Sequence, residues 1–151
     1  MNARRIVLAL VTMAAGLVFG SAGAFAQERN LFAVLRGPNE NQAADPNGTG
    51  TAMVTFRNPT LTQICVIIFV DAIDNPLAAP NGAHIHRGGG GTNGPVVVSL
   101  NPPATGAAAV SRSCVPIAPA LSAEIRSNPA AFYVNVHTGL FPAGAVRGQL
   151  F

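Results

Sequence analysis

The 151-residue sequence predicts an all-β protein, an antiparallel sandwich or Greek-key barrel of about eight strands. Short runs rich in Val, Ile and Phe recur along the chain, as is typical of strands. Turns built from Gly, Pro and Asn separate these runs. Only residues 119–127 suit a helix, which Asn128-Pro129 would end. Neither an internal repeat nor a second domain is evident.

The eight expected strands are short, and each is bounded by turn residues. Their expected ranges are 31–35, 51–57, 64–70, 82–87, 96–100, 104–115, 132–138 and 145–151. The run 64–70 is nearly continuously apolar, which favours a strand covered on both faces. The glycine-rich stretch 88–95 is expected to be a loop between strands, because it lacks the Lys-Ser/Thr ending of a phosphate-binding loop.

The N-terminal segment has the composition of a secretory signal peptide. A basic start with two arginines precedes an apolar run over residues 6–19, and Ala24-Phe25-Ala26 forms an A-x-A cleavage signature. Residues 1–26 are therefore predicted to be removed on export, which leaves one domain over residues 27–151 in the periplasm or the medium. After the signal, no apolar run is long enough to span a membrane.

The charge of the expected mature domain excludes several classes of function. It contains seven arginines, six acidic residues and no lysine, so its formal charge is close to neutral. A domain with so little net positive charge lacks the strongly basic character of nucleic-acid-binding proteins, so we expect no nucleic-acid partner. The absence of lysine from the sequence also excludes Schiff-base chemistry on a lysine.

Cys65 and Cys114 are the two cysteines of the chain. In an exported protein, a disulfide between them is the default expectation. The alternative is a thiolate ligand of a blue-copper site, which also needs two histidines and usually an axial methionine. The expected mature chain offers only Met53 for that position.

The three histidines fall in two expected strands and form the sharpest chemical pattern in the sequence. His84 and His86 project from one face of the first strand, because side chains alternate with a period of two. In the second strand, His137 shares a face with Tyr133 and Asn135. If the two strands are neighbours, the three imidazoles converge, and neutral imidazoles suit copper or zinc. Tyr133 and Asn135 would then supply supporting hydrogen bonds.

Two stretches resemble the CHRD domain, a module named after chordin and found in many bacterial exported proteins. The first stretch is Ala83-His84-Ile85-His86-Arg87-Gly88 with Asn93-Gly94-Pro95-Val96-Val97. The second is Tyr133-Val134-Asn135-Val136-His137-Thr138 with Pro142-Ala143-Gly144 and Arg147-Gly148-Gln149-Leu150. Together they extend the resemblance over essentially the whole expected mature chain.

The resemblance implies an immunoglobulin-like or superoxide-dismutase-like fold, and it implies much less about activity. In animals the domain belongs to an extracellular antagonist of growth factors, whereas stand-alone bacterial copies suggest no function by analogy. Fold alone does not give function, so the site must carry the functional argument.

Two arginines lie beside glycines in the family motifs. Arg87 and Arg147 are candidates for contact with an anion or with a carboxylate of a partner. Ion pairing to Glu124, or hydrogen bonding to a backbone carbonyl, is the alternative role for each of them.

The sequence thus predicts an exported, non-enzymatic binding domain with a surface copper or zinc site at His84, His86 and His137. One alternative is a secreted protein-interaction module in which the histidines are purely structural. Another is a mononuclear copper redox protein. The partner is therefore expected to be a metal ion or an unidentified protein.

Overall fold

The computed structural model describes residues 30–58, 60–73, 75–78, 81–105 and 108–151. The predicted signal peptide, residues 1–26, lies outside the described residues. Eight strands form one antiparallel sheet, with the neighbour order β5-β4-β7-β8-β1-β2-β3-β6. The strands are β1 (Asn30–Arg36), β2 (Thr49–Arg57), β3 (Gln63–Asp71), β4 (Ala83–Arg87), β5 (Val96–Leu100), β6 (Ala109–Pro116), β7 (Phe132–Val136) and β8 (Val146–Gln149).

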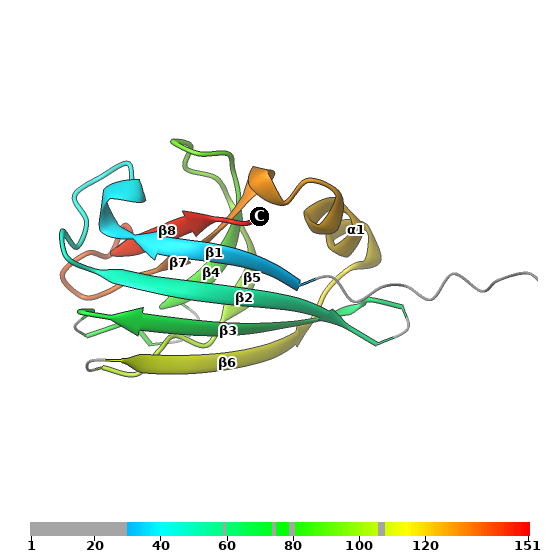
Figure 1. Ribbon diagram of the computed structural model, residues 1–151, viewed down its shortest axis with the longest axis horizontal. Coiled ribbons are helices and arrows are strands. Elements are labelled where there is room, and N and C mark those ends of the chain that lie inside the picture. Colours follow the sequence, from blue (N-terminus) through cyan, green and yellow to red (C-terminus); the bar gives the residue numbers. More distant parts are fainter. Residues whose placement is uncertain (1–29, 59, 74, 79–80, 106–107) are drawn as a thin grey trace, which may run out of the picture.

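The sheet curls until its two edge strands, β5 and β6, approach each other, so the fold is a nearly closed barrel. In Figure 1, β1, β2, β3 and β6 run side by side, while β4, β5 and β7 pass behind them. Asn101, just after β5, donates its backbone N–H to Ser113 Oγ at 2.7 Å and its side-chain amide to the Arg112 carbonyl at 3.2 Å. β7, β4 and β5 are neighbours in the sheet, and the contacts across the seam add β6 beside β5, which gives the order β7-β4-β5-β6 of a Greek key. The predicted all-β class is therefore confirmed.

Alternation along the strands places one apolar face of each strand inside the barrel. β1 alternates strictly between exposed and buried residues, and Leu31, Ala33 and Leu35 point inward. Ile85 of β4 and Val134 of β7 are both fully buried. Burying each such large aliphatic side chain contributes about 1.5–3 kcal/mol, which makes this interior the main source of stability.

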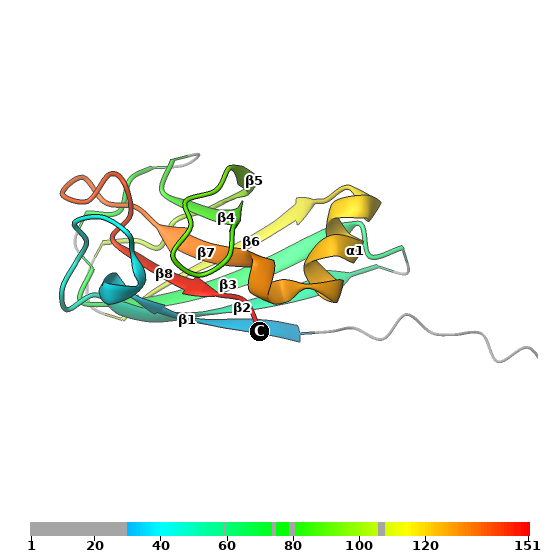
Figure 2. The same cartoon turned by 90° about the horizontal axis from the view of Figure 1, so that it is seen from above.

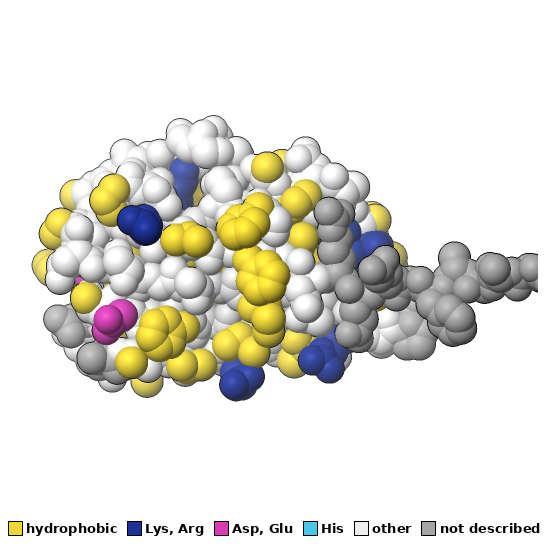
Figure 3. Space-filling view, in the orientation of Figure 1, with side chains coloured by type: hydrophobic (Ala, Val, Ile, Leu, Met, Phe, Trp, Pro, Cys, Tyr) yellow, Lys and Arg dark blue, Asp and Glu magenta, His cyan; other side chains and the backbone are white. Residues whose placement is uncertain are grey.

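The prediction that the run 64–70 is covered on both faces was wrong. Only the inner face of β3 is buried, and Phe69 on the outer face remains 39% exposed. It belongs to an apolar band on the outer face of the sheet, together with Phe32 and Val34 of β1 and Val110 of β6. Figure 3 shows hydrophobic side chains gathered over this face. The apolar sequence of residues 64–70 therefore could not tell a strand buried on both faces from a strand with one buried face and one exposed apolar face.

The described part of the chain has one α-helix, which occupies the predicted range. α1 (Pro119–Ser127) begins with a proline in its first turn and buries Ser122 and Ile125. Two short 3₁₀ helices, η1 (Gly37–Asn39) and η2 (Pro129–Ala131), lie outside the strands. Figure 2 shows α1 and η2 following each other along one side of the sheet. Within the described residues, no helix is long and apolar enough to cross a membrane.

All eight predicted strands are present, and most of their ends differ from the prediction by one or two residues. Two differences matter most. β6 begins at Ala109 instead of residue 104, because Ala108 adopts a left-handed backbone (φ 55°) that interrupts the extended chain. β7 ends at Val136, so His137 lies one residue beyond the strand. The backbone N–H of His137 still bonds to the Gly82 carbonyl, at 2.9 Å.

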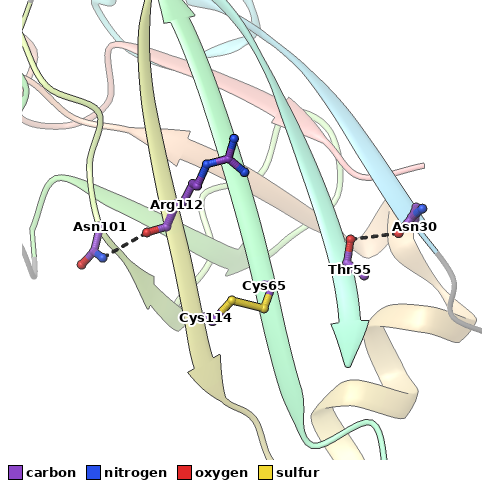
Figure 4. The surroundings of a disulfide bond; sticks show 6 residues. All are labelled: Asn30, Thr55, Cys65, Asn101, Arg112 and Cys114. Atoms are coloured by element: carbon purple, nitrogen blue, oxygen red, sulfur yellow. Dashed lines mark hydrogen bonds between the residues drawn. A yellow bond between two sulfur atoms is a disulfide. The ribbon is translucent and has the colours of Figure 1, made fainter. Parts of the chain in front are cut away.

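The predicted disulfide is confirmed. Cys65 and Cys114 face each other directly in the register of β3 and β6, and their sulfurs are bonded. Figure 4 shows the bridge joining these strands on the sheet, with the Asn101–Arg112 hydrogen bond nearby. Both sulfurs are committed to the bridge, so neither cysteine serves as a thiolate metal ligand here. The bridge ties the edge strand β6 to the sheet.

Replacing both cysteines by serine should lower the free energy of unfolding by about 2–4 kcal/mol, because the bridge no longer restricts the unfolded chain. The strand ladder should survive, since β3 and β6 also pair through their backbones. Denaturant unfolding of both proteins tests this expectation. Dithiothreitol provides the control: it should destabilise the wild type and leave the double variant unchanged. Equal stability of the two proteins without reductant would contradict it.

Candidate metal centre

The pairing of β4 with β7 brings the three histidines together. In this antiparallel register His84 lies opposite Asn135, and His86 lies opposite Tyr133. Ile85, between the two histidines, points into the core, so both imidazoles project from the outer face of the barrel. His137 follows β7 directly and reaches the same face. The predicted convergence of the imidazoles is present in the structure.

The three rings are in mutual contact. His84 Nδ1 lies 3.1 Å from His137 Nε2. The His84 and His86 ring centroids are 5.4 Å apart, and those of His86 and His137 are 6.1 Å apart. One ligand nitrogen from each ring lies within 4.8 Å of the other two. Among the described residues, these three histidines form the group of at least three His, Cys, Asp or Glu side chains that lie close enough together to hold one metal ion.

The prediction of a surface site was wrong, since the rings are nearly covered. His84, His86 and His137 expose 8%, 9% and 9% of their surface. Loops lie over the outer face of β4 and β7 at this point and contribute polar atoms. The covering segments include the glycine-rich loop 88–95 and the segment 138–145 that follows His137. The centre is therefore a buried polar cluster outside the hydrophobic core.

Backbone carbonyls of these two loops orient two of the imidazoles. His86 Nδ1 lies 2.9 Å from the Gly94 carbonyl, and His137 Nδ1 lies 3.1 Å from the Pro142 carbonyl. A carbonyl only accepts hydrogen bonds, so each neutral ring carries its proton on Nδ1 and has a lone pair on Nε2. His86 Nε2 is buried without a hydrogen-bond partner. Metal-ligating histidines are commonly held in this way.

Burial keeps at least two of these rings neutral at pH 7. Desolvation lowers the pKa of His137 to about 4, helped by the neighbouring His84. Desolvation also lowers the pKa of His86, with His84 and Arg147 contributing in the same direction. A neutral imidazole is the form that ligates a metal ion, so the cluster is prepared for a cation without first releasing protons from these rings.

Tyr133 connects the histidines to a buried arginine. Its ring stacks on His86 at 4.8 Å between centroids with an interplanar angle of 6°. The guanidinium of Arg147 also lies over the Tyr133 ring, 4.3 Å from its centroid. The Tyr133 hydroxyl accepts a hydrogen bond from the Gly94 N–H at 3.3 Å. The predicted neighbour of the histidines therefore packs against His86 and anchors the loop that holds it.

Asn135 turns away from the histidines toward a carboxyl group. Its side-chain amide donates to Glu40 Oε1 at 2.5 Å. Desolvation raises the pKa of Glu40 to about 7, against the lowering effect of Arg147. Gly144 packs beside both side chains with φ 143°, so a Cβ there would be strained and would collide with them.

The two arginines singled out in the sequence occupy different environments. Arg87 is half exposed and forms an ion pair with Glu124 of α1, with Nη2 and Oε2 2.6 Å apart. Its position on β4 turns it away from the imidazoles, and its guanidinium lies over Phe132 at 5.7 Å. Arg147 on β8 is almost fully buried beside the histidine cluster.

Sequence reasoning missed Glu40 and the carbonyls of Gly94 and Pro142. Glu40 lies 95 residues from its partner Asn135, and no local pattern links the two. The carbonyl acceptors have no side-chain signature at all. The one available signal was the run of glycines and prolines around the two histidine strands, which predicted loops without giving their course.

Replacing Glu40 with glutamine should remove one component of the pH dependence of stability. The folded-state pKa of Glu40 is raised, so the contribution of this residue should fall as pH rises from the unfolded value near 4.5 toward 7. The lowered pKa values of His86 and His137 act in the opposite direction, but equally in both proteins. The stability advantage of Glu40→Gln should therefore be small at pH 4 and largest above pH 7. Melting temperatures of both proteins from pH 4 to 8.5 test this. Parallel curves across that range would refute it.

Comparison with known proteins identifies the family of the chain. The family model described as the CHRD domain matches residues 31–150. No curated protein and no solved structure matches the chain. The matched range contains the eight strands, apart from Asn30 at the start of β1, together with the disulfide and the three histidines. The chain therefore belongs to the CHRD domain family.

Proposed function

We propose that the protein is an exported, non-enzymatic binding domain whose three histidines hold one copper or zinc ion. The observation that carries this proposal is the cluster of His84, His86 and His137 nitrogens, which lie within 4.8 Å of one another in a buried position. One nitrogen of the cluster, His86 Nε2, is buried without a hydrogen-bond partner, which is costly unless a ligand such as a metal ion satisfies it.

The geometry supports a metal ion in two ways. Two nitrogens bound at about 2.0–2.1 Å to one tetrahedral ion are about 3.3 Å apart. His84 Nδ1 and His137 Nε2 are separated by 3.1 Å, and the hydrogen bond that His84 donates there would give way to the ion once the His84 proton moves to its Nε2. His86 Nε2 has no hydrogen-bond partner, and one ligand nitrogen of its ring lies within 4.8 Å of nitrogens of the other two histidines. Three imidazole nitrogens leave a further coordination position open.

The choice of copper or zinc follows from the ligand type. Neutral imidazole suits both ions, whereas calcium and magnesium prefer oxygen ligands. Export is supported by the disulfide and by the signal-like N-terminal sequence. An exported domain with a histidine site would act in metal binding or sequestration. A redox role would require copper at the same three ligands.

The rival proposal is an interaction module in which the histidines are structural. It is supported by the carbonyl bonds of His86 and His137, since structural histidines also make such bonds. The two proposals differ in what chelation does. A metal protein should lose its ion and the function tied to it, whereas an interaction module should keep its affinity for its partner.

Protein exported from its native host should contain close to one equivalent of copper or zinc. The double variant His84→Ala/His137→Ala should contain none, because it loses two of three ligands. Elemental mass spectrometry of the purified proteins measures this directly. Arg87→Ala is the matched control, since it lies next to His86 but pairs with Glu124 at the surface. It should retain the metal. A metal-free wild type with no measurable affinity on titration would reject the proposal.

Metal binding should also stabilise the fold, because only the folded chain brings the three rings together. At a free ion concentration of 100 times the dissociation constant, the gain is about 2.7 kcal/mol. Thermal unfolding of chelator-stripped protein with added Zn²⁺ tests this expectation. The melting temperature of the wild type should rise with ion concentration and fall again with EDTA. An equal rise in the double variant would show that the ion binds elsewhere.

A further inference from the structure

A pocket of about 440 Å³ lies beside the histidine cluster, on the far side of Tyr133. Its lining includes Glu40 and Asn41 from the loop after η1, Gly90 and Gly91 from the glycine-rich loop, and Arg147 from β8. A side chain added at Gly90 or Gly91 would meet nothing within 4 Å, so the pocket is open on the side of these glycines.

Arg147 is the unusual member of this pocket. It is the largest fully buried side chain of the described residues, with 1% of its surface exposed. All its hydrogen-bond acceptors are neutral: the Thr92 carbonyl at 3.2 Å, Asn93 Oδ1 at 3.2 Å and Asn41 Oδ1 at 3.4 Å. Within the described part of the chain, no carboxylate lies within 4 Å of the Arg147 guanidinium. Glu124, for example, forms its ion pair with Arg87 instead. A buried charge without a counter-ion is costly.

Glu40 is the acidic residue among those that line the pocket, and it compensates the positive charge of Arg147 only in part. Its Oε1 accepts from Asn135 and does not contact the guanidinium. Burial outweighs the attraction of Arg147, so the carboxyl group keeps its proton up to about pH 7. The pocket therefore presents a fixed positive charge beside a weak acid.

The guanidinium is most accessible at Asn41. The contact from Nη2 to Asn41 Oδ1, at 3.4 Å, is the longest of the three and exceeds the usual range of an N–H···O bond. Asn41 is exposed, and its amide also donates a surface hydrogen bond to Asn93 Oδ1 at 3.0 Å, so its displacement breaks surface contacts and leaves the core undisturbed. An anionic oxygen in its place would form a shorter, charge-assisted hydrogen bond.

We propose that this pocket binds a small oxyanion, a carboxylate or phosphate group, on the guanidinium of Arg147. The planar guanidinium matches both groups, and the charge it leaves uncompensated supplies the attraction. The ring of Tyr133 separates the anion from the histidines, so binding does not require a metal ion at His84, His86 and His137.

Calorimetric titration of metal-free protein with inorganic phosphate and, separately, with acetate tests the proposal, at constant ionic strength set with chloride. One or both probes should bind saturably, and the comparison shows which oxyanion the pocket prefers. Asn41→Asp should weaken binding at least about tenfold, because a carboxylate of the chain itself would then occupy the guanidinium. This exposed position leaves the fold intact, unlike Arg147.

Asn47→Asp is the matched control, since it makes the same charge change at another exposed position of the same loop. It should leave binding within about twofold of the wild type, as expected for a distant, screened charge. Glu40→Gln should strengthen binding severalfold at pH 8, where it removes a negative charge in the pocket that repels the anion. Absence of saturable binding to either probe, or equal weakening by both Asn-to-Asp variants, would overturn the proposal.

Discussion

The pairing of β4 with β7 is the constraint on which the rest of the site depends. One register sets two faces at once: Ile85 and Val134 meet in the core, while His86 and Tyr133 meet outside it. A shift by one residue would exchange these faces and place imidazoles in the apolar interior. The hydrophobic core therefore fixes the position of the histidines, although none of them contributes to it.

Loops complete what the strands begin. The outer face of β4 and β7 would be open to solvent in an isolated sheet, but the chain brings two loops across it. The glycine-rich loop serves both neighbouring sites, since Thr92 and Asn93 accept from Arg147 while Gly94 accepts from His86. This shared loop links the anion pocket and the histidine centre mechanically, and burial by the loops lowers the pKa of His86 and His137.

The sequence predicted the strands and the shared face of the histidines because a period of two is a local property. The pairing of the two histidine strands stayed a condition of the metal-site hypothesis, because strand pairing depends on residues far apart in the sequence. Burial of the rings escaped prediction, since it depends on loop contacts between distant residues, such as that from Arg147 to the Thr92 carbonyl of the glycine-rich loop. The partly buried contact between Glu40 and Asn135 escaped for the same reason. The exposure of the outer face of β3 was predicted wrongly, because an apolar residue such as Phe69 looks the same in the sequence whether its side chain is buried or lies on an apolar surface.

The position of Tyr133 has an optical consequence. The chain contains one tyrosine and no tryptophan, so its intrinsic fluorescence comes from this ring. The ring lies between the imidazole of His86 and the guanidinium of Arg147, at 4.8 Å and 4.3 Å. Emission from the native protein thus reports on both sides of the ring without an added label. A paramagnetic ion among the imidazoles would quench it at close range, so the protein contains its own reporter of occupancy.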